Sequence, residues 1–215
     1  MKPCVVSAAD HAGWAHVLVV AAADAVPAVV ARRRIALIEP GLPTMPYHHE
    51  SLGLDVEQAD RLIARVRESV DACARRALHE ITACLMPSYS AVALSIRHPT
   101  YPALPDSVAQ IRTSYALQCA ADGMMYTLAL CAAAHAAGLE VHQCRRGEEV
   151  ARAAASLRTA PADVTTFVTT TGRPPGPPWA DEHRRAFAAG IAALACHAPT
   201  ALRIHGDVRA SGTVV

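Results

Sequence analysis

An aspartate among small residues near the N-terminus is the first side chain of this chain that could do chemistry. Asp10 ends the extended run Val5–Asp10, and Gly13 follows three residues later. Because its neighbours are small, a ligand or another stretch of backbone can come close to the carboxylate. Asp10 is therefore a candidate metal ligand. In the alternative interpretation, its side chain caps the turn at Ala12–Gly13 through a hydrogen bond.

The densest group of polar side chains is the segment Tyr47–Glu50, in a loop rich in proline. Its two imidazoles, His48 and His49, and the carboxylate of Glu50 are donors that suit zinc, iron or manganese. In an extended segment, adjacent residues point to opposite sides, so His48 and Glu50 would share a side while His48 and His49 would need a bend. The alternative is a solvent-exposed loop in which Tyr47 packs on the core.

Two further groups of polar side chains lie next to expected secondary structure. Arg97–His98 follows the apolar run Ala91–Ile96. An arginine there can bind a phosphate or carboxylate through two parallel hydrogen bonds, or it can simply extend into solvent. Asp181 and His183 stand at the start of an alanine-rich helix. They are candidate ligands, and the alternative is a first turn whose acidic residues complement the helix dipole.

Strands that alternate with helices must position these side chains. Apolar runs and turn residues predict a β-hairpin, with room for a third strand, in the first forty residues, from the runs Val5–Val20 and Val29–Ile38. They also predict strands at Ala91–Ile96 and Leu139–Cys144. Helical spacing and capping residues predict helices at Val56–Leu85, from Asp106 or Ser107 to Ala137, at Glu148–Leu157 and from Ala180 to His197. Two segments are different: Val164–Thr171 reads as strand or loop, and Pro174–Pro178 as an extended connector.

This order predicts an α/β fold with a mixed β-sheet, in which an N-terminal hairpin is flanked by helices. A chain of 215 residues is long enough for one domain with a sizeable core. We expect a single domain over residues 1–197 and a C-terminal tail over 198–215. Because alanine is abundant and aromatic residues are few, we expect helices to pack closely on the sheet.

The amino-acid composition limits the classes of function that this protein can have. A formal net charge of +1 gives no global field that attracts nucleic acid. Seven cysteines without a CxxC pair indicate free thiols in a reducing compartment. We find neither a signal-peptide pattern nor an uncharged apolar run of the roughly 18–20 residues that a membrane span needs. We therefore expect a cytoplasmic protein that does not associate with membranes.

The order of elements and several short motifs resemble the ribonuclease H-like superfamily, and within it the RuvC-type resolvases. The resemblance covers about residues 4–197. Asp10 with Gly13–Trp14–Ala15 matches the first strand and its turn, and Gly138–Leu139 introduces a strand after an alanine-rich helix. In the last helix, Asp181 or His183 followed by alanines matches the acidic or histidine ligands of the family.

The resemblance implies a nuclease site with one departure. The family places a catalytic glutamate where this chain has Arg97–His98. Two-metal catalysis needs several converging carboxylates, and an arginine among them opposes cation binding. We therefore expect Asp10 and Asp181 as catalytic residues, with Glu50 or Glu39 as a substitute third acid. The expected cofactor is Mg²⁺ or Mn²⁺, and the expected metal ligands are Asp10, His48, His49, Glu50 and Asp181.

Three functions follow as hypotheses. The first is a divalent-metal-dependent phosphodiester hydrolase with an altered acidic site, acting on nucleic acid. The second is a non-catalytic protein of the same fold that binds a partner protein or a small anionic ligand through Arg97, His98 and His183, with the His48–Glu50 loop. The third is a mononuclear metal enzyme that uses this loop together with His98. The partners to expect are nucleic acid and a second copy of the chain as a homodimer.

Overall fold

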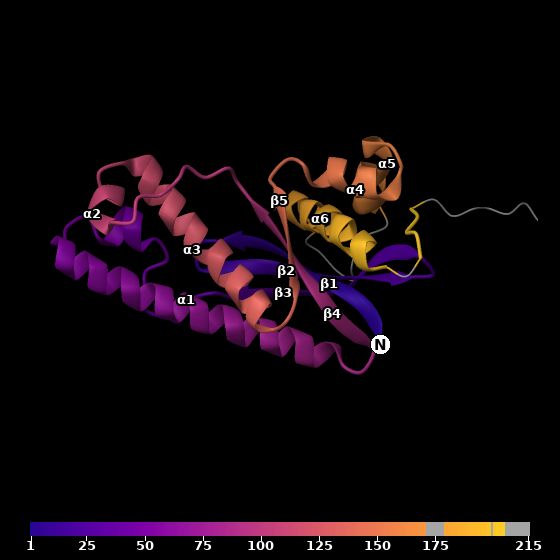
Figure 1. Ribbon diagram of the computed structural model, residues 1–215, viewed down its shortest axis with the longest axis horizontal. Helices are drawn as coiled ribbons and strands as arrows, with labels where there is room; N and C mark the ends of the chain where they lie inside the picture. The colour runs from indigo at the N-terminus through magenta and orange to yellow at the C-terminus, as the bar shows by residue number, and fades with distance from the viewer. Residues whose placement is uncertain (171–178, 199, 205–215) are drawn as a thin grey trace, which may run out of the picture.

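A mixed sheet forms the middle of the molecule, with helices on both faces (Figure 1). The computed structural model describes residues 1–170, 179–198 and 200–204. Within these residues the sheet has five strands in the order β3-β2-β1-β4-β5. β1 pairs antiparallel with β2 and parallel with β4, and β5 is parallel to β4. The strands are β1 (Lys2–His11), β2 (Trp14–Ala23), β3 (Val26–Ala36), β4 (Tyr89–His98) and β5 (Glu140–Arg145).

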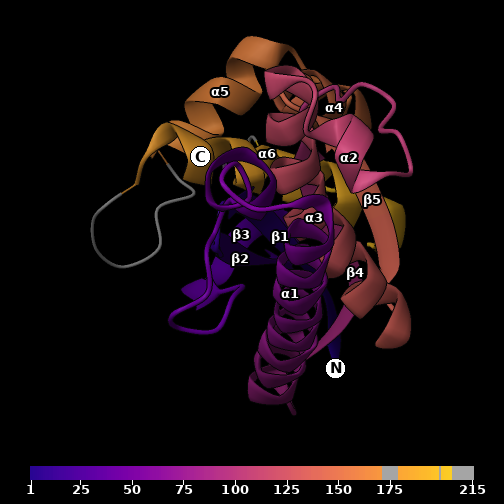
Figure 2. The ribbon, with the colours of Figure 1, turned by 90° about the vertical axis from the view of Figure 1, so that its left-hand side faces the viewer.

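The helices divide between the two faces of the sheet. α1 and α3 cover one face, and α4, α5 and α6 cover the other, so that Figure 2 shows α5 and α6 above the strands and α1 below. Two short helices, η1 and α2, lie against α3. The helices are η1 (Pro46–Glu50), α1 (Val56–Leu85), α2 (Val108–Ile111), α3 (Tyr115–Ala136), α4 (Glu149–Leu157), α5 (Pro161–Thr170) and α6 (Asp181–His197). The expected α/β architecture is confirmed.

The central strand β1 contributes to both cores because its side chains alternate between the two faces. Val6 and Ala8 are buried in the core under α1 and α3. Val5 and Ala9 are buried in the core under α6. This alternation decides which side of the sheet each polar residue of β1 faces.

α6 lies close to the sheet because its contact residues are small. Ala186, Ala188 and Ala189 are buried, and a Cβ atom on Gly190 would stand 2.7 Å from the Val20 Cγ2 atom. It would also stand 3.1 Å from the Ser7 Cβ atom. The alanine-rich sequence therefore allows the close helix–sheet packing that its composition indicates.

The segment expected to be strand or loop is instead the helix α5, over residues 161–170; residue 171 lies outside the described residues. Valine and threonine are poor helix formers in isolation, but here tertiary packing prevails. Val164, Phe167 and Val168 are buried on one side. On the exposed side, threonine hydroxyls donate to carbonyls four residues earlier, as Thr169 does to Thr165 at 2.7 Å. The proline-rich connector expected at 174–178 also lies outside the described residues.

The long helix expected to run from Asp106 or Ser107 is interrupted. Ser107 caps the short helix α2 by accepting from the Gln110 N–H at 3.4 Å. The chain then turns, and α3 begins at Tyr115. α3 is the one helix among the described residues that is long and apolar enough to cross a membrane, yet 61% of that span is buried inside the molecule. Its apolar surface thus packs largely against α1 and the sheet.

The described part of the proposed C-terminal tail packs against the domain. Leu202 is buried in the core under α6, and the Arg203 N–H donates to the Ala25 carbonyl at 2.9 Å. Packing therefore continues beyond His197 to residue 204.

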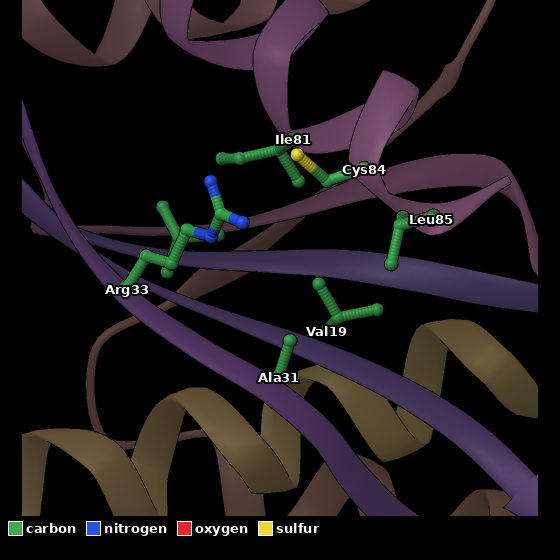
Figure 3. Close-up of a pocket in the computed structure, with 7 residues that line it drawn as sticks. Val19, Ala31, Arg33, Ile81, Cys84 and Leu85 are labelled. Carbon is green, nitrogen blue, oxygen red and sulfur yellow. The ribbon is translucent and has the colours of Figure 1, made fainter.

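Strand alternation places neighbouring arginines of β3 on opposite sides of the sheet. Arg33 lies on the α1 side and lines a pocket of about 60 Å³ beside Ile81 and Cys84 (Figure 3). Arg34 lies on the other side, with its guanidinium carbon 4.2 Å from the centre of a Trp14 ring. A pocket of this size holds only a few water molecules.

Gly190→Ala is expected to destabilise the protein by about 1–3 kcal/mol. The added methyl group would overlap Val20, which is fully buried, and this clash outweighs the roughly 1 kcal/mol that alanine contributes in a helix. Urea denaturation measures the difference. In a Val20→Ala background the same change should be neutral or stabilising, and an equal loss in both backgrounds would contradict the packing argument.

Candidate functional site

The carboxyl ends of three parallel strands meet at one edge of the sheet. Asp10 lies near the end of β1, Arg97 near the end of β4, and Arg146 directly after β5. The start of α6 reaches the same edge, where the Glu182 carboxylate lies 2.7 Å from the His11 Nε2 atom. In α/β sheets, ligands bind outside the carboxyl ends of the strands. This edge is therefore the candidate functional site.

Asp10 is buried on the α3 side of the sheet, in line with Val6 and Ala8. Its Oδ2 atom accepts a hydrogen bond from the Thr127 hydroxyl on α3 at 2.8 Å. Its Oδ1 atom lies 3.5 Å from the Arg146 Nη2 atom, without a hydrogen bond. The side chain is 4% exposed, so this carboxylate joins the sheet, α3 and the β5–α4 connection in the interior.

The polar residue of β1 that faces α6 is Ser7. Its hydroxyl donates to the Ala186 carbonyl at 2.6 Å, and the side chain is fully buried. Asp10 stands three positions further along the strand and so faces the opposite side. The structure therefore does not bring Asp10 and Asp181 together on one face of the sheet.

Arg97 forms a buried ion pair at the end of β4. Its Nε donates to the Glu149 Oε1 atom at 2.7 Å, and the two side chains are 9% and 1% exposed. The other oxygen of Glu149 accepts from the Gly147 N–H at 2.8 Å and lies 3.8 Å from the Arg185 Nη1 atom. A second contact of Arg97 reaches the Glu182 carbonyl at 3.4 Å. The guanidinium is thus enclosed by protein groups, unlike the solvent-exposed alternative.

Asp181 is a surface residue of the first turn of α6, with a side chain 62% exposed. A hydrogen bond from Arg185, one turn later, lowers the pKa of its carboxyl, and Arg184 lies 3.6 Å away. This placement matches the acidic first turn that complements a helix dipole.

His98 points its Nδ1 atom at the Pro99 carbonyl, 2.9 Å away, so this nitrogen is the donor and Nε2 the acceptor of the neutral ring.

The loop residues His48, His49 and Glu50 lie in η1 and not in an extended segment. The turn brings the two imidazole rings to 3.8 Å between centroids. η1 packs against α3 and α1. The loop thus lies on the α3 side of the sheet.

A buried aspartate of α3 holds this loop in place. The two carboxylate oxygens of Asp122 each accept a backbone N–H at 3.0 Å, from Tyr47 and from His48. Burial raises the pKa of Asp122 to about 7, although both hydrogen bonds oppose the shift. Asp122 is not among the site residues expected from the sequence, because in the sequence it is a single polar residue within an apolar helix.

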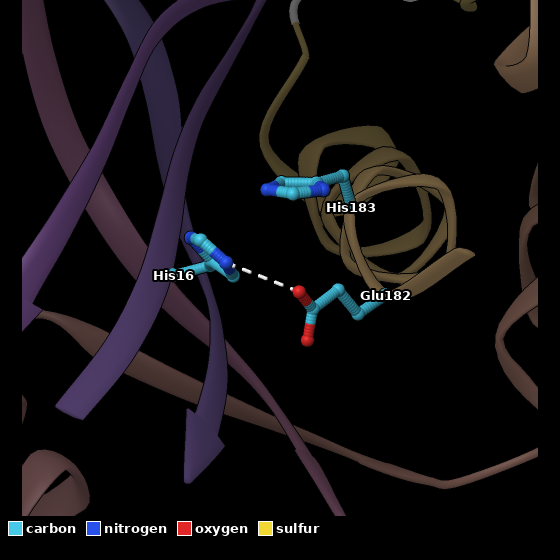
Figure 4. A group of neighbouring side chains, drawn as sticks. All are labelled: His16, Glu182 and His183. Carbon is cyan, nitrogen blue, oxygen red and sulfur yellow. Dashed lines mark ion pairs between the residues drawn. The ribbon is translucent and has the colours of Figure 1, made fainter. Parts of the chain in front are cut away.

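A cluster of imidazoles and one carboxylate lies on the α6 side of the same edge. Glu182 is 3.0 Å from the His16 Nε2 atom through Oε1 and 2.7 Å from the His11 Nε2 atom through Oε2. His183 stacks near His16, with 4.2 Å between ring centroids. The donor atoms of His16, Glu182 and His183 all lie within 4.8 Å of one another, and Figure 4 shows the three side chains converging from β2 and α6.

His16 and His183 differ in the hydrogen bonds of their ring nitrogens, and this difference affects how each could bind a metal ion. Burial lowers the pKa of both His16 and His183, which favours neutral rings. The Nδ1 atom of His183, however, accepts the Ala180 N–H at 3.1 Å and caps the start of α6. Its proton then sits on Nε2, so a cation bound at either nitrogen would have to displace a proton or this cap. His16 caps no helix, and its Nε2 atom faces the Glu182 carboxylate at 3.0 Å.

The sequence singles out Asp181 and His183 but not their partners. His11 and His16 become neighbours of α6 only through the register of the hairpin, in which His11 pairs with Trp14 and Ala9 with His16. Glu149 follows another glutamate, and nothing local distinguishes the buried one from its neighbour. No signal in the sequence marks these pairings.

Comparison with solved structures identifies the fold of this chain. The chain is similar to a Thermus thermophilus RuvC structure, with 12% sequence identity, a TM-score of 0.50, and coverage of 90% of this chain and 95% of the other. A second T. thermophilus RuvC, in complex with a Holliday junction substrate, aligns with 13% identity, a TM-score of 0.49, and coverage of 90% and 94%. No protein-family model and no curated protein matches the sequence. The fold is therefore ribonuclease H-like.

The residues at this edge do not fit two divalent cations. Among the described residues, neither group of three or more metal-binding side chains includes Asp10, Glu50 or Asp181. Arg146 stands beside the one carboxylate of β1, and Arg97 occupies the end of β4. Each of the two buried acids at this edge, Asp10 and Glu149, already has a guanidinium as its counter-charge, and these positive charges oppose a pair of cations.

Arg97→Ala is expected to destabilise the protein by about 3 kcal/mol, because it leaves the buried Glu149 without its closest counter-charge. Urea denaturation monitored by circular dichroism measures this loss. The double variant Arg97→Met with Glu149→Leu removes both charges and should recover much of the stability. A single variant as stable as the wild type would show that the pair does not hold this edge together.

Asp122→Asn should gain stability relative to the wild type as pH rises from about 4 to about 7. Because the folded pKa of Asp122 is raised, the unfolded chain releases this proton first, and the wild type loses stability across that window. Each tenfold difference in proton affinity between the folded and unfolded chains corresponds to about 1.4 kcal/mol. Thermal or urea denaturation of both proteins across the window measures the change, and a constant difference would contradict the raised pKa.

Proposed function

We propose that this protein is a non-cleaving member of the ribonuclease H-like fold that binds a phosphate-bearing ligand at the carboxyl edge of its sheet. The observation that carries the proposal is the buried ion pair between Arg97 and Glu149 at 2.7 Å. At the end of β4, where the resemblance to the nuclease family implies a carboxylate, this chain has the Arg97 guanidinium. The nearby acid, Glu149, is buried against it. The geometry thus favours anions at a place where a nuclease would need cations.

The half-exposed groups at this edge support the binding of phosphate. Arg146 and Arg185 are 45% and 43% exposed, whereas their partners Asp10 and Glu149 are 4% and 1% exposed. Each guanidinium lies near a buried carboxylate, at 3.5 Å for Arg146 and 3.8 Å for Arg185, while the side chain is about half exposed. Arg185 also pairs with the exposed Asp181, which a bound phosphate would have to displace. Planar guanidinium groups held in this way suit phosphate oxygens.

Direct binding assays test the proposal. Fluorescence anisotropy would compare single-stranded DNA, branched DNA and a fluorescent nucleotide, in the absence of divalent metal. Arg146→Gln and Arg185→Gln should each weaken binding several-fold and reduce its dependence on salt. Arg33→Gln on the α1 side is the matched control and should leave affinity unchanged. Circular dichroism confirms that each variant folds.

Three outcomes would overturn the proposal. The first is an affinity that neither arginine variant changes. The second is the absence of binding to every phosphate-bearing probe. The third is Mg²⁺- or Mn²⁺-dependent cleavage that Asp10→Asn abolishes, which would restore the nuclease hypothesis.

A second candidate is hydrolysis of a phosphodiester with a single cation, favoured by the convergence of His16, Glu182 and His183 within 4.8 Å. A divalent cation held there would supply a Lewis acid and an activated water. The chain would supply the Glu182 carboxylate, now shared between His11 and His16. Glu182→Gln should then abolish metal-dependent cleavage and metal binding together. The cap formed by His183 makes this candidate the weaker one.

A further inference from the structure

At the opposite end of β5 and α6, two imidazoles and a carboxylate point at one another. Glu140 and His142 lie two residues apart on β5 and so share a face of this edge strand. His197 is the last residue of α6. This group lies at the start of β5, away from the carboxyl edge of the sheet.

The distances within the group match the spacing of ligands around one metal ion. The Nε2 atoms of His142 and His197 are 3.0 Å apart. The Glu140 carboxylate is 3.2 Å from the first through Oε1 and 3.7 Å from the second through Oε2. In a tetrahedral zinc site with bonds of about 2.0–2.1 Å, neighbouring donor atoms stand roughly 3.3 Å apart. The observed separations bracket that value.

The two imidazoles are arranged as ligands and not as a stacked pair. Their rings are nearly perpendicular, at 87°, with centroids 5.2 Å apart, so the nitrogen tips approach and the rings diverge. The two rings can form one N–H···N hydrogen bond in this position, and the Glu140 carboxylate lies beside both nitrogens.

We propose that Glu140, His142 and His197 form a binding site for one divalent zinc-type cation. Two imidazoles with one carboxylate are donors that select zinc over magnesium or calcium. Neither histidine uses its Nε2 atom in a helix cap, in contrast to the Nδ1 atom of His183 at the other end of α6.

Three protein ligands leave one position of a tetrahedron for water or another ligand. His142 also lines a groove of about 340 Å³ between β5, α4 and α6, together with Ser95, Arg152 and Cys196. The proposed site thus lies beside a groove that a small molecule can enter. The site is independent of the phosphate-binding edge proposed above, since the two share no residue.

Zinc binding to the full-length protein tests the inference. After treatment with a chelator, titration with ZnCl₂ followed by elemental analysis should give one zinc ion per chain, and Co²⁺ in its place should give the visible absorption of a tetrahedral site. His142→Ala and His197→Ala should each weaken binding by more than about 100-fold, since removal of a ligand costs more than removal of its outer support. Glu140→Gln should have a smaller effect.

Control variants locate the ion. His135→Ala on the exposed surface of α3 should leave binding unchanged, and so should Cys196→Ser, whose thiol is exposed next to His197. Circular dichroism and the Tm of the metal-free variants establish that they fold. Zinc should also raise the Tm of the wild type and not that of the double variant His142→Ala with His197→Ala.

Three results would overturn the inference. The site is excluded by a wild type that binds no zinc, by binding that survives in the double variant, or by binding that Cys196→Ser abolishes. Loss of binding in Glu182→Gln alone would assign the ion to the cluster at the start of α6. None of these outcomes depends on whether the protein binds phosphate, so the two proposals fail separately.

Discussion

The alternation of side chains along β1 is the constraint on which the rest of the structure depends. β1 is the central strand, and each of its residues must face either α3 or α6. Ser7 therefore meets α6, and Asp10 meets α3. A slip of the register by one residue would exchange the two and would expose one core to water, so packing fixes the direction of the carboxylate. The chemistry at this edge follows from that choice.

Charge pairing at the carboxyl edge continues the same pattern. The two buried acids, Asp10 and Glu149, each have a guanidinium within 3.5 Å. A buried carboxylate without a partner would be costly, and each pairing here also joins separate elements of the fold. Asp10 connects β1 with α3 and the β5–α4 connection, while Glu149 connects α4 with β4. Arg97 thus stabilises the edge from inside, while Arg146 pairs with Asp10 and leaves about half of its side chain in solvent.

α6 links the two ends of the molecule. Its first turn brings Glu182 and His183 to the hairpin, and its last residue brings His197 to β5. Because the helix is rich in alanine and carries Gly190 at its closest contact, it lies near enough to the sheet for these short contacts. Helix packing and polar chemistry are therefore coupled along its whole length.

The order of elements could be predicted from the sequence, because strands and helices have local periodicities and local stop signals. The mixed sheet, the long helix α1 and the final helix α6 follow from such signals. α5 could not be predicted, since its threonines favour strands locally, and only burial of Phe167 and Val168 makes it helical. No proline or glycine marks the interruption before α3, where the Arg112 side chain donates to the Ser51 and Leu54 carbonyls of a distant loop.

What the sequence by itself determined is the inventory: an aspartate on the first strand, an arginine at the end of β4, and a histidine near the start of the last helix. Only the tertiary structure decided which of these meet. Asp10 pairs with Arg146, Arg97 with Glu149, and His142 with His197, across separations of 136, 52 and 55 residues in the chain. The physical reason is that such pairs are set by strand register and by how helices sit on the sheet, which no local pattern encodes.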